Sequence, residues 1–115
     1  MYFIINNTEW NIVFVPAFTE YLQRSDGSYT IGMTDNNTNT VYICDKLHGE
    51  KLRHVVCHEI THAICFSYDI YMPIELEEKL CNFVADYGEE IIYLVEDILK
   101  NTTKKQIKLV PPTYL

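Results

Sequence analysis

Four short apolar runs come first in the chain, and two long stretches with a helical spacing of apolar residues follow them. The runs are rich in β-branched and aromatic residues, and they comprise residues 2–5, 10–15, 29–33 and 40–44. Runs of this length and composition predict β-strands. The polar segments 6–8 and 34–39 supply turns between them. We therefore expect a small antiparallel sheet of three or four strands, with the 34–39 loop exposed to solvent.

The later part of the chain predicts two long helices. The first runs from about His48 to Tyr68, and several of its apolar residues share one arc at the roughly 100° step of a helix. These residues are Leu52, Val56, Ile60, Ala63 and Ile64. Pro73 suits the first turn of a second helix, which is amphipathic over residues 74–100. The pattern thus predicts an α+β fold, in which the sheet packs on two long helices.

The length of 115 residues suits a single domain, which we expect to span residues 1–110 and to be followed by a short tail, 111–115. Within it, residues 17–24 predict a short helix. Residues 106–110 can form a last strand, and the two prolines directly after it end regular structure.

Composition narrows the classes of function. The net charge is −7, which disfavours a nucleic-acid-binding surface because phosphate contacts need clustered Lys and Arg. No apolar run approaches the length that spans a membrane, and residues 1–6 lack the pattern of a secretory signal. The four cysteines have no C-x-x-C spacing. We expect a cytoplasmic protein whose thiols are reduced and act mainly as small core residues.

The strongest chemical signal is an H-E-x-x-H motif, formed by His58, Glu59 and His62 on the side of the first helix opposite its apolar arc. Two imidazoles four positions apart lie on the same helix face, where they can share a tetrahedral Zn²⁺. The glutamate between them is placed to act on a water rather than to bind the metal. His54, one turn earlier, is expected to be exposed. The motif predicts His58 and His62 as zinc ligands and Glu59 as the catalytic base.

A catalytic zinc usually has three protein ligands, so one ligand must come from elsewhere. The second helix offers Glu77 and Glu78. Glu78 lies at the edge of the apolar face of that helix and Glu77 lies further into it, and helix geometry alone does not choose between them. Asn82, one turn after Glu78, can orient a ligating imidazole by accepting its other N–H.

The segment from Glu78 to Ala85 resembles the E-x-x-A-N-x-F-A segment of ImmA/IrrE-type zinc metallopeptidases, which are zincins common in phages and mobile elements. The residues around H-E-x-x-H and the strand-like segments 32–34 and 41–43 are also similar to that family, so the resemblance covers roughly residues 29–90. Cys81 stands where the family has alanine, and Val84 stands where it has phenylalanine. The resemblance implies a minimal zincin-like fold and assigns Glu78 as the third zinc ligand.

The expected function is therefore that of a zinc-dependent endopeptidase. The resemblance implies a protein or peptide substrate, such as a transcriptional repressor of a phage or mobile element. The strand at 41–44 is expected to lie along the cleft and to pair with an extended substrate. Two other interpretations compete: a zinc-stabilised regulatory binding module without proteolytic activity, and a metal-free α+β interaction domain.

Overall fold

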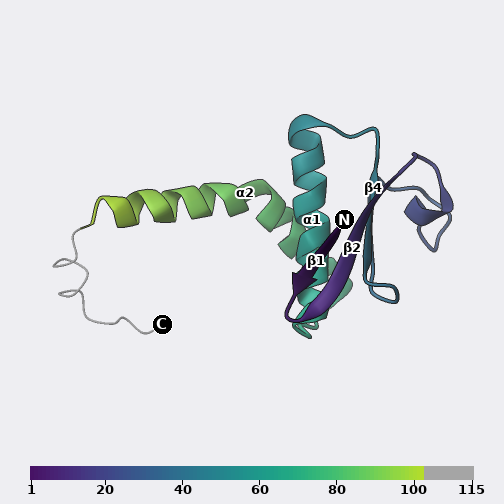
Figure 1. Ribbon diagram of the computed structural model, residues 1–115, viewed down its shortest axis with the longest axis horizontal. Coiled ribbons are helices and arrows are strands. Elements are labelled where there is room, and N and C mark those ends of the chain that lie inside the picture. Colours follow the sequence, from purple (N-terminus) through teal and green to yellow (C-terminus); the bar gives the residue numbers. More distant parts are fainter. Residues whose placement is uncertain (103–115) are drawn as a thin grey trace.

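The computed structural model describes residues 1–102 (Figure 1). Its elements, in chain order, are β1 (Tyr2–Ile5), β2 (Thr8–Val15), the 3-10 turn η1 (Glu20–Leu22), β3 (Gly32–Asp35), β4 (Thr40–Cys44), α1 (Gly49–Ser67) and α2 (Ile74–Lys100). The predicted α+β class, with four strands and two long helices, is confirmed. The strand expected at 106–110 and the tail at 111–115 lie outside the described residues.

Three sequence expectations about the strands and their connections need correction. The short helix expected at 17–24 is reduced to η1. The third strand begins at Gly32 rather than at residue 29, because Tyr29 forms an isolated bridge with Gln23 instead. Thr34, which we assigned to an exposed loop, belongs to β3 and is half-buried.

The sheet has the order β1-β2-β4-β3. The outer pairs, β1 with β2 and β3 with β4, are antiparallel as predicted. The central pair, β2 with β4, is parallel, and this corrects the fully antiparallel sheet we expected. The chain from Pro16 to Ile31, which contains η1, carries the backbone back to the far edge of the sheet before β3 begins. As a result the two hairpins join side by side through their inner strands.

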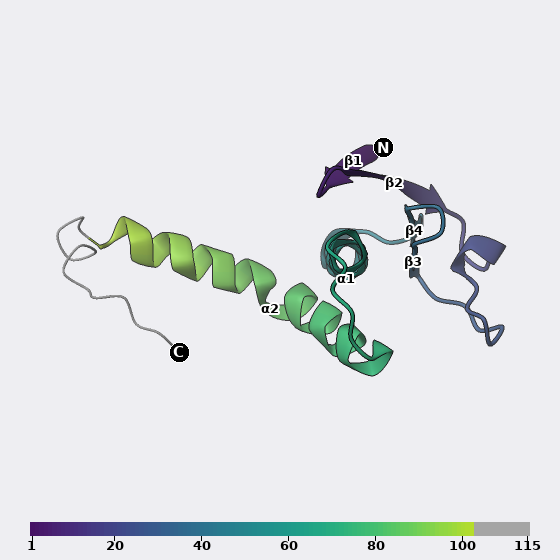
Figure 2. The same ribbon diagram turned by 90° about the horizontal axis from the view of Figure 1, so that it is seen from below.

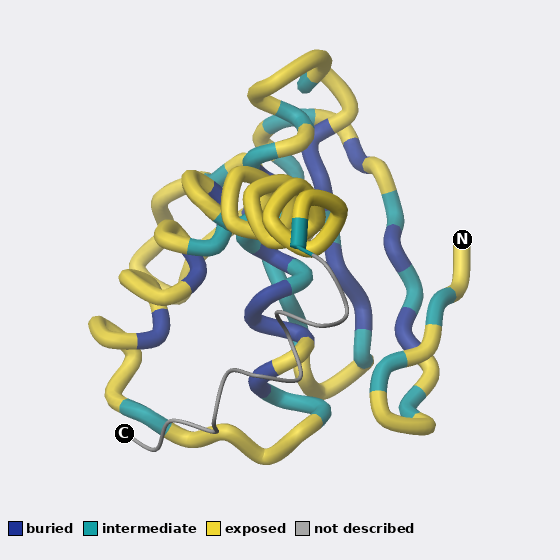
Figure 3. Tube along the Cα trace, turned by 90° about the vertical axis from the view of Figure 1, so that its left-hand side faces the viewer, coloured by how far each residue is buried: buried dark blue, intermediate teal, exposed yellow. Residues whose placement is uncertain are grey.

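One face of the sheet packs on α1, and the main core lies between them. It consists of Trp10, Ile12, Val41, Ile43, Val55 and Ala63. The indole N–H of Trp10 donates to Ser67 Oγ at 2.7 Å, which ties β2 to the end of α1. Figure 3 shows the buried positions following the inner strands and α1. Two neighbouring residues of the apolar arc predicted for α1 differ in burial: Ala63 is buried, whereas Ile64 is exposed.

The second helix divides into two parts that we call the proximal half, residues 74–88, and the distal half, residues 89–100. The buried residues of α2 are Glu77, Cys81 and Ala85, all in the proximal half, which packs against α1. Figure 2 looks along α1 and shows it between the strands and the first turns of α2. Every residue of the distal half is exposed, and this half extends away from the sheet. Within residues 1–102, neither helix combines the length and apolar content that crossing a membrane requires.

Candidate metal centre

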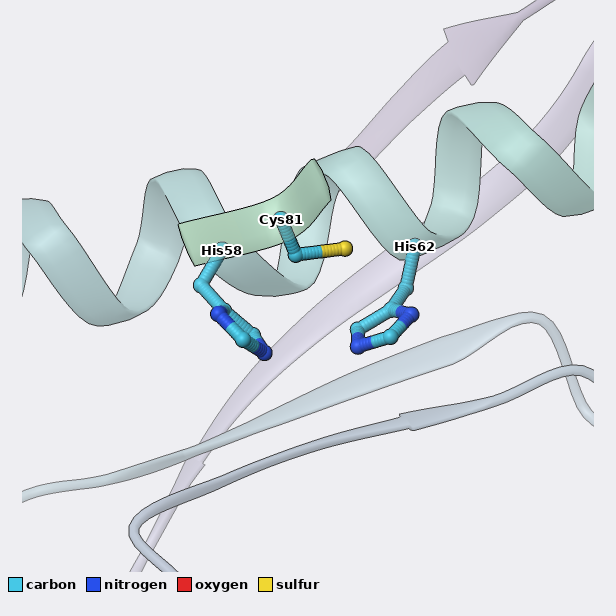
Figure 4. A group of neighbouring side chains, drawn as sticks. All are labelled: His58, His62 and Cys81. Atoms are coloured by element: carbon cyan, nitrogen blue, oxygen red, sulfur yellow. The ribbon is translucent and has the colours of Figure 1, made fainter. Parts of the chain in front are cut away.

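The two histidines of the motif lie one turn apart on α1, and their ring centroids are 5.0 Å apart. Both side chains project from α1 beside the segment of α2 that carries Cys81 (Figure 4). The side chains of His58 and His62 are only 15% and 9% exposed. They line a cavity of about 260 Å³ together with Glu59, Glu77 and Glu78.

Glu78 lies across the two imidazoles. One of its carboxylate oxygens is 3.2 Å from His58 Nε2, and the other is 2.9 Å from His62 Nε2. Both ring nitrogens therefore face the same carboxylate. Imidazole nitrogen and carboxylate oxygen are the donors that Zn²⁺ takes in catalytic sites with two histidines and one glutamate. This donor set fits a zinc ion held between α1 and α2.

Glu77 has a different contact, although it is the neighbouring residue. Its carboxylate is buried and hydrogen-bonds His62 Nδ1 at 2.5 Å. A carboxylate that accepts the Nδ1–H of an imidazole fixes the ring orientation and leaves the lone pair of Nε2 free for a metal. The orienting role that we expected of Asn82 thus falls to Glu77. Asn82 itself is exposed, and its side chain makes no hydrogen bond within the described part of the chain.

Glu59 is buried beside the histidines, and its carboxylate is held from β3. Thr34 Oγ1 donates to Glu59 Oε1 at 2.8 Å, while Glu59 Oε2 lies 4.0 Å from His58 Nε2. Burial raises the pKa of the Glu59 carboxyl group, and the hydrogen bond from Thr34 opposes this shift in part. Sequence reasoning missed Thr34, because its contact with Glu59 joins two elements that are 25 positions apart. A carboxylate in this position can exchange a proton with a molecule bound at the imidazoles.

Gly32 allows β3 to approach α1 closely enough for that contact. A Cβ at this position would lie 2.8 Å from Val55 Cγ1 and 3.0 Å from Glu59 Oε2. Real Cβ atoms are not found so close to other heavy atoms, so a side chain at Gly32 would push the strand or the carboxylate away. The glycine serves close packing here and not an unusual backbone angle.

The strand at the cavity is β3, not the β4 segment that we expected to pair with a substrate. β4 lies between β2 and β3 and is paired on both sides, so it has no free edge. The N–H of Cys44 donates to the carbonyl oxygen of Ile31 at 3.0 Å. This hydrogen bond shows which residues of β3 direct their backbone groups towards β4 and which direct them to the other side. By the alternation of an antiparallel pair, the N–H and C=O groups of Gly32 and Thr34 point to the free edge. Both residues line the cavity.

Cys81 on α2, which sequence reasoning treated as a packing residue, also lies close enough to the histidines to hold a metal ion with them. Its Sγ and one nitrogen from each of His58 and His62 all lie within 4.8 Å of one another. The side chain is fully buried, and burial raises the pKa of the thiol to about 12. All four cysteines are free thiols. The chain offered a signal for Cys81, because it lies one turn after Glu78 on the same helix face.

His54 stays outside the site, as expected. Its Nε2 lies 2.7 Å from Asp86 Oδ1 at the surface, where the contact joins α1 to α2. Arg53 makes a similar link at 2.6 Å to Glu89, the first residue of the distal half.

The fold and the site together define a class of arrangement: a small sheet with two helices, a histidine pair on one helix, and carboxylate and thiol donors facing it from the next. Comparison of the chain with protein-family models, with curated proteins and with solved structures finds no match. The residues that can hold a metal ion are therefore identified from their positions in the structure alone.

Proposed function

We propose that this protein is a cytoplasmic zinc-dependent endopeptidase of the ImmA/IrrE type. The observation that carries the proposal is the position of Glu59, which is buried beside His58 and held by Thr34 at 2.8 Å. A site that only binds metal has no use for a buried carboxylate kept next to its ligands and outside the ligand set. The ligands we propose are His58, His62 and Glu78.

Each residue has a separate task in peptide hydrolysis. His58, His62 and Glu78 hold the zinc, and Glu77 keeps the His62 ring in the orientation that this requires. When bound, zinc lowers the pKa of a water molecule and polarises the scissile carbonyl group. Glu59 accepts the proton of the attacking water and passes it to the leaving amine.

The substrate that we propose is an extended segment of a protein, with a phage or mobile-element transcriptional repressor as the class that the family resemblance implies. Support comes from the free edge of β3, where backbone groups of Gly32 and Thr34 lie beside the cavity. An extended peptide can add to such an edge as a further strand, and its scissile bond then lies over the histidines.

The second candidate is a zinc-stabilised regulatory module without proteolytic activity. Cys81 favours it, because four protein donors around one zinc are typical of structural sites, which hold no water. The buried Glu59 favours the endopeptidase.

The two candidates differ in the effect of Glu59→Gln. We expect the variant to bind zinc in the same ratio as the wild type, measured by elemental analysis, and to lose cleavage of a randomised peptide library read by mass spectrometry. Glu75→Gln is the matched control, since Glu75 is an exposed glutamate on α2 and should change neither result. Retained cleavage by Glu59→Gln would contradict the role of Glu59. A wild-type protein without zinc would favour the metal-free interaction domain.

The folding of the Glu59→Gln variant has its own check. Because the folded-state pKa of Glu59 is raised above its usual value of 4.5, the ionised carboxylate disfavours folding of the metal-free protein at neutral pH. Glutamine removes this penalty. We therefore expect metal-free Glu59→Gln to be at least as stable as the wild type near pH 7. Its advantage should shrink as the pH falls from neutral towards 4.5 and should be absent below that value, as measured by urea unfolding.

A further inference from the structure

We propose that Cys81 is a fourth protein ligand of the metal, and that its thiolate closes the site in the resting protein. This inference rests on the proposed zinc site and adds a mode of regulation to it. It concerns the coordination position that a hydrolytic site leaves open for water.

The position of Cys81 on α2 supports ligation. It follows Glu78 by three residues, so both side chains project from the same face of the proximal half towards α1. In Figure 4 the sulfur of Cys81 points into the space between His58 and His62. The sulfur and the two ring nitrogens lie within 4.8 Å of one another. In a tetrahedral zinc site with Zn–S of about 2.3 Å and Zn–N of about 2.0 Å, sulfur and nitrogen are about 3.5 Å apart. An approach of roughly 1 Å therefore completes the geometry.

The thiol also has no competing partner. Cys81 is completely buried, and its sulfur makes no hydrogen bond within residues 1–102. Cys57, by contrast, points to the backbone of α2, where its Sγ lies 3.7 Å from the carbonyl oxygen of Val84. Among the cysteines, which all lie in the described part of the chain, Cys81 alone groups with the histidine pair.

The four donors differ in their access to solvent, and this difference suggests how the site works. His58, His62 and Cys81 form the buried side of the site, whereas the Glu78 side chain is 48% exposed. Ligation by Cys81 releases its thiol proton to solvent and fills the fourth position around zinc. Opening is the reverse exchange: a water takes the fourth position and the thiolate recovers a proton. Hydrolysis then requires this exchange, so the resting enzyme is latent.

Cobalt in place of zinc gives a test that does not depend on activity. Co²⁺ added to the metal-free protein produces visible bands whenever it binds in a tetrahedral site. A thiolate ligand adds a charge-transfer band in the near ultraviolet. We expect both signals in the wild type. Cys81→Ala should keep the visible bands and lose the charge-transfer band, and Cys81→Ser serves as a second variant of nearly unchanged size. Cys57→Ala and Cys65→Ala are matched controls and should keep both signals.

The outcomes separate this inference from the proposed function. Visible bands without a charge-transfer band in the wild type would overturn the role of Cys81 and leave the zinc site standing. The role of Cys81 is equally overturned if the band survives in both Cys81 variants or disappears in Cys65→Ala. Absence of any cobalt signal in the wild type would overturn the zinc site itself. With ligation by Cys81, cleavage of the peptide library by Cys81→Ala should exceed that of the wild type, while its zinc affinity falls by about tenfold or more.

Discussion

The proximal and distal halves of α2 have the same helical spacing of apolar residues but opposite surroundings. In the proximal half, the positions that face α1 are small: Cys81 and Ala85 are buried, and Gly88 is half-buried. In the distal half the same stripe continues with Ile91 and Val95, which are both 44% exposed. Small residues thus coincide with the part of the helix that contacts α1, where they permit close packing.

Close contact matters because the site is divided between the two helices. Glu77 and Glu78 reach the imidazoles only if the backbones of α1 and α2 approach each other near the start of α2. Small side chains one and two turns further on permit this approach. The distal half adds length to the helix and contributes no residue to the cavity. The residues that α2 contributes to the cavity thus all lie in the proximal half.

We expect the largest loss of stability and of zinc affinity from a larger side chain in the contact between α1 and the proximal half of α2. Ala85→Leu inserts a larger side chain where Ala85 is buried against α1, and overpacking of this kind costs about 1–3 kcal/mol. We expect the free energy of urea unfolding to fall by that amount and the zinc affinity to fall with it, because the helices separate. Val95→Leu makes a similar change in the distal half and should leave both quantities unchanged. Equal losses in the two variants would remove the distinction between the halves.

An intermediate effect is expected at Glu77. Glu77→Gln removes the charge that orients His62 but preserves the shape of the side chain. Loss of such a partner typically weakens metal binding by about 10–100-fold. Competition with a coloured chelator measures this affinity. Glu90→Gln, in the distal half, is the matched control. A variant of Glu77 with unchanged zinc affinity would show that the proximal half holds His62 by packing alone.

The smallest effect concerns the surface contact at the boundary between the halves. Asp86→Asn weakens the 2.7 Å contact between Asp86 and His54. The side chain of His54 is 40% exposed and that of Asp86 is 49% exposed. Exposed pairs of this kind contribute less than about 1 kcal/mol. We expect a slight drop in the urea midpoint and no change in zinc affinity, with Glu96→Gln as the distal control. A marked loss of zinc would mean that this contact, and not the small residues, aligns the helices.

Much of this architecture was accessible from the sequence. The two helices begin and end within about one residue of the predicted bounds, since apolar periodicity and Pro73 are local signals. His58, Glu59 and His62 lie in one cavity because their spacing is itself a helical geometry. Local patterns also predicted both hairpins of the sheet.

Features that depend on how elements far apart in the sequence pack together could not be predicted from the sequence. The parallel pairing of β2 with β4 follows from the path between the hairpins, which carries no periodic signal. Glu77 and Glu78 differ by one helical step, so their different contacts depend on how α2 is rotated against α1. The hydrogen bond from Thr34 to Glu59 depends on the close approach of β3 at Gly32. In each case tertiary packing decides between alternatives that the local sequence leaves equal.

The parallel pairing of β2 with β4 has a consequence for the order of folding. It joins residue 11 to residue 40, 29 positions further on, and pairings of such separation are slow because a long loop must close first. The contact of His62 with Glu77, which joins the two helices at the metal donors, spans only 15 positions and can form earlier. We therefore expect a folding chain to take up its metal before Thr34 arrives to hold Glu59. A newly made chain would then pass through a stage in which the metal is bound and the Glu59 carboxylate is not yet held by Thr34.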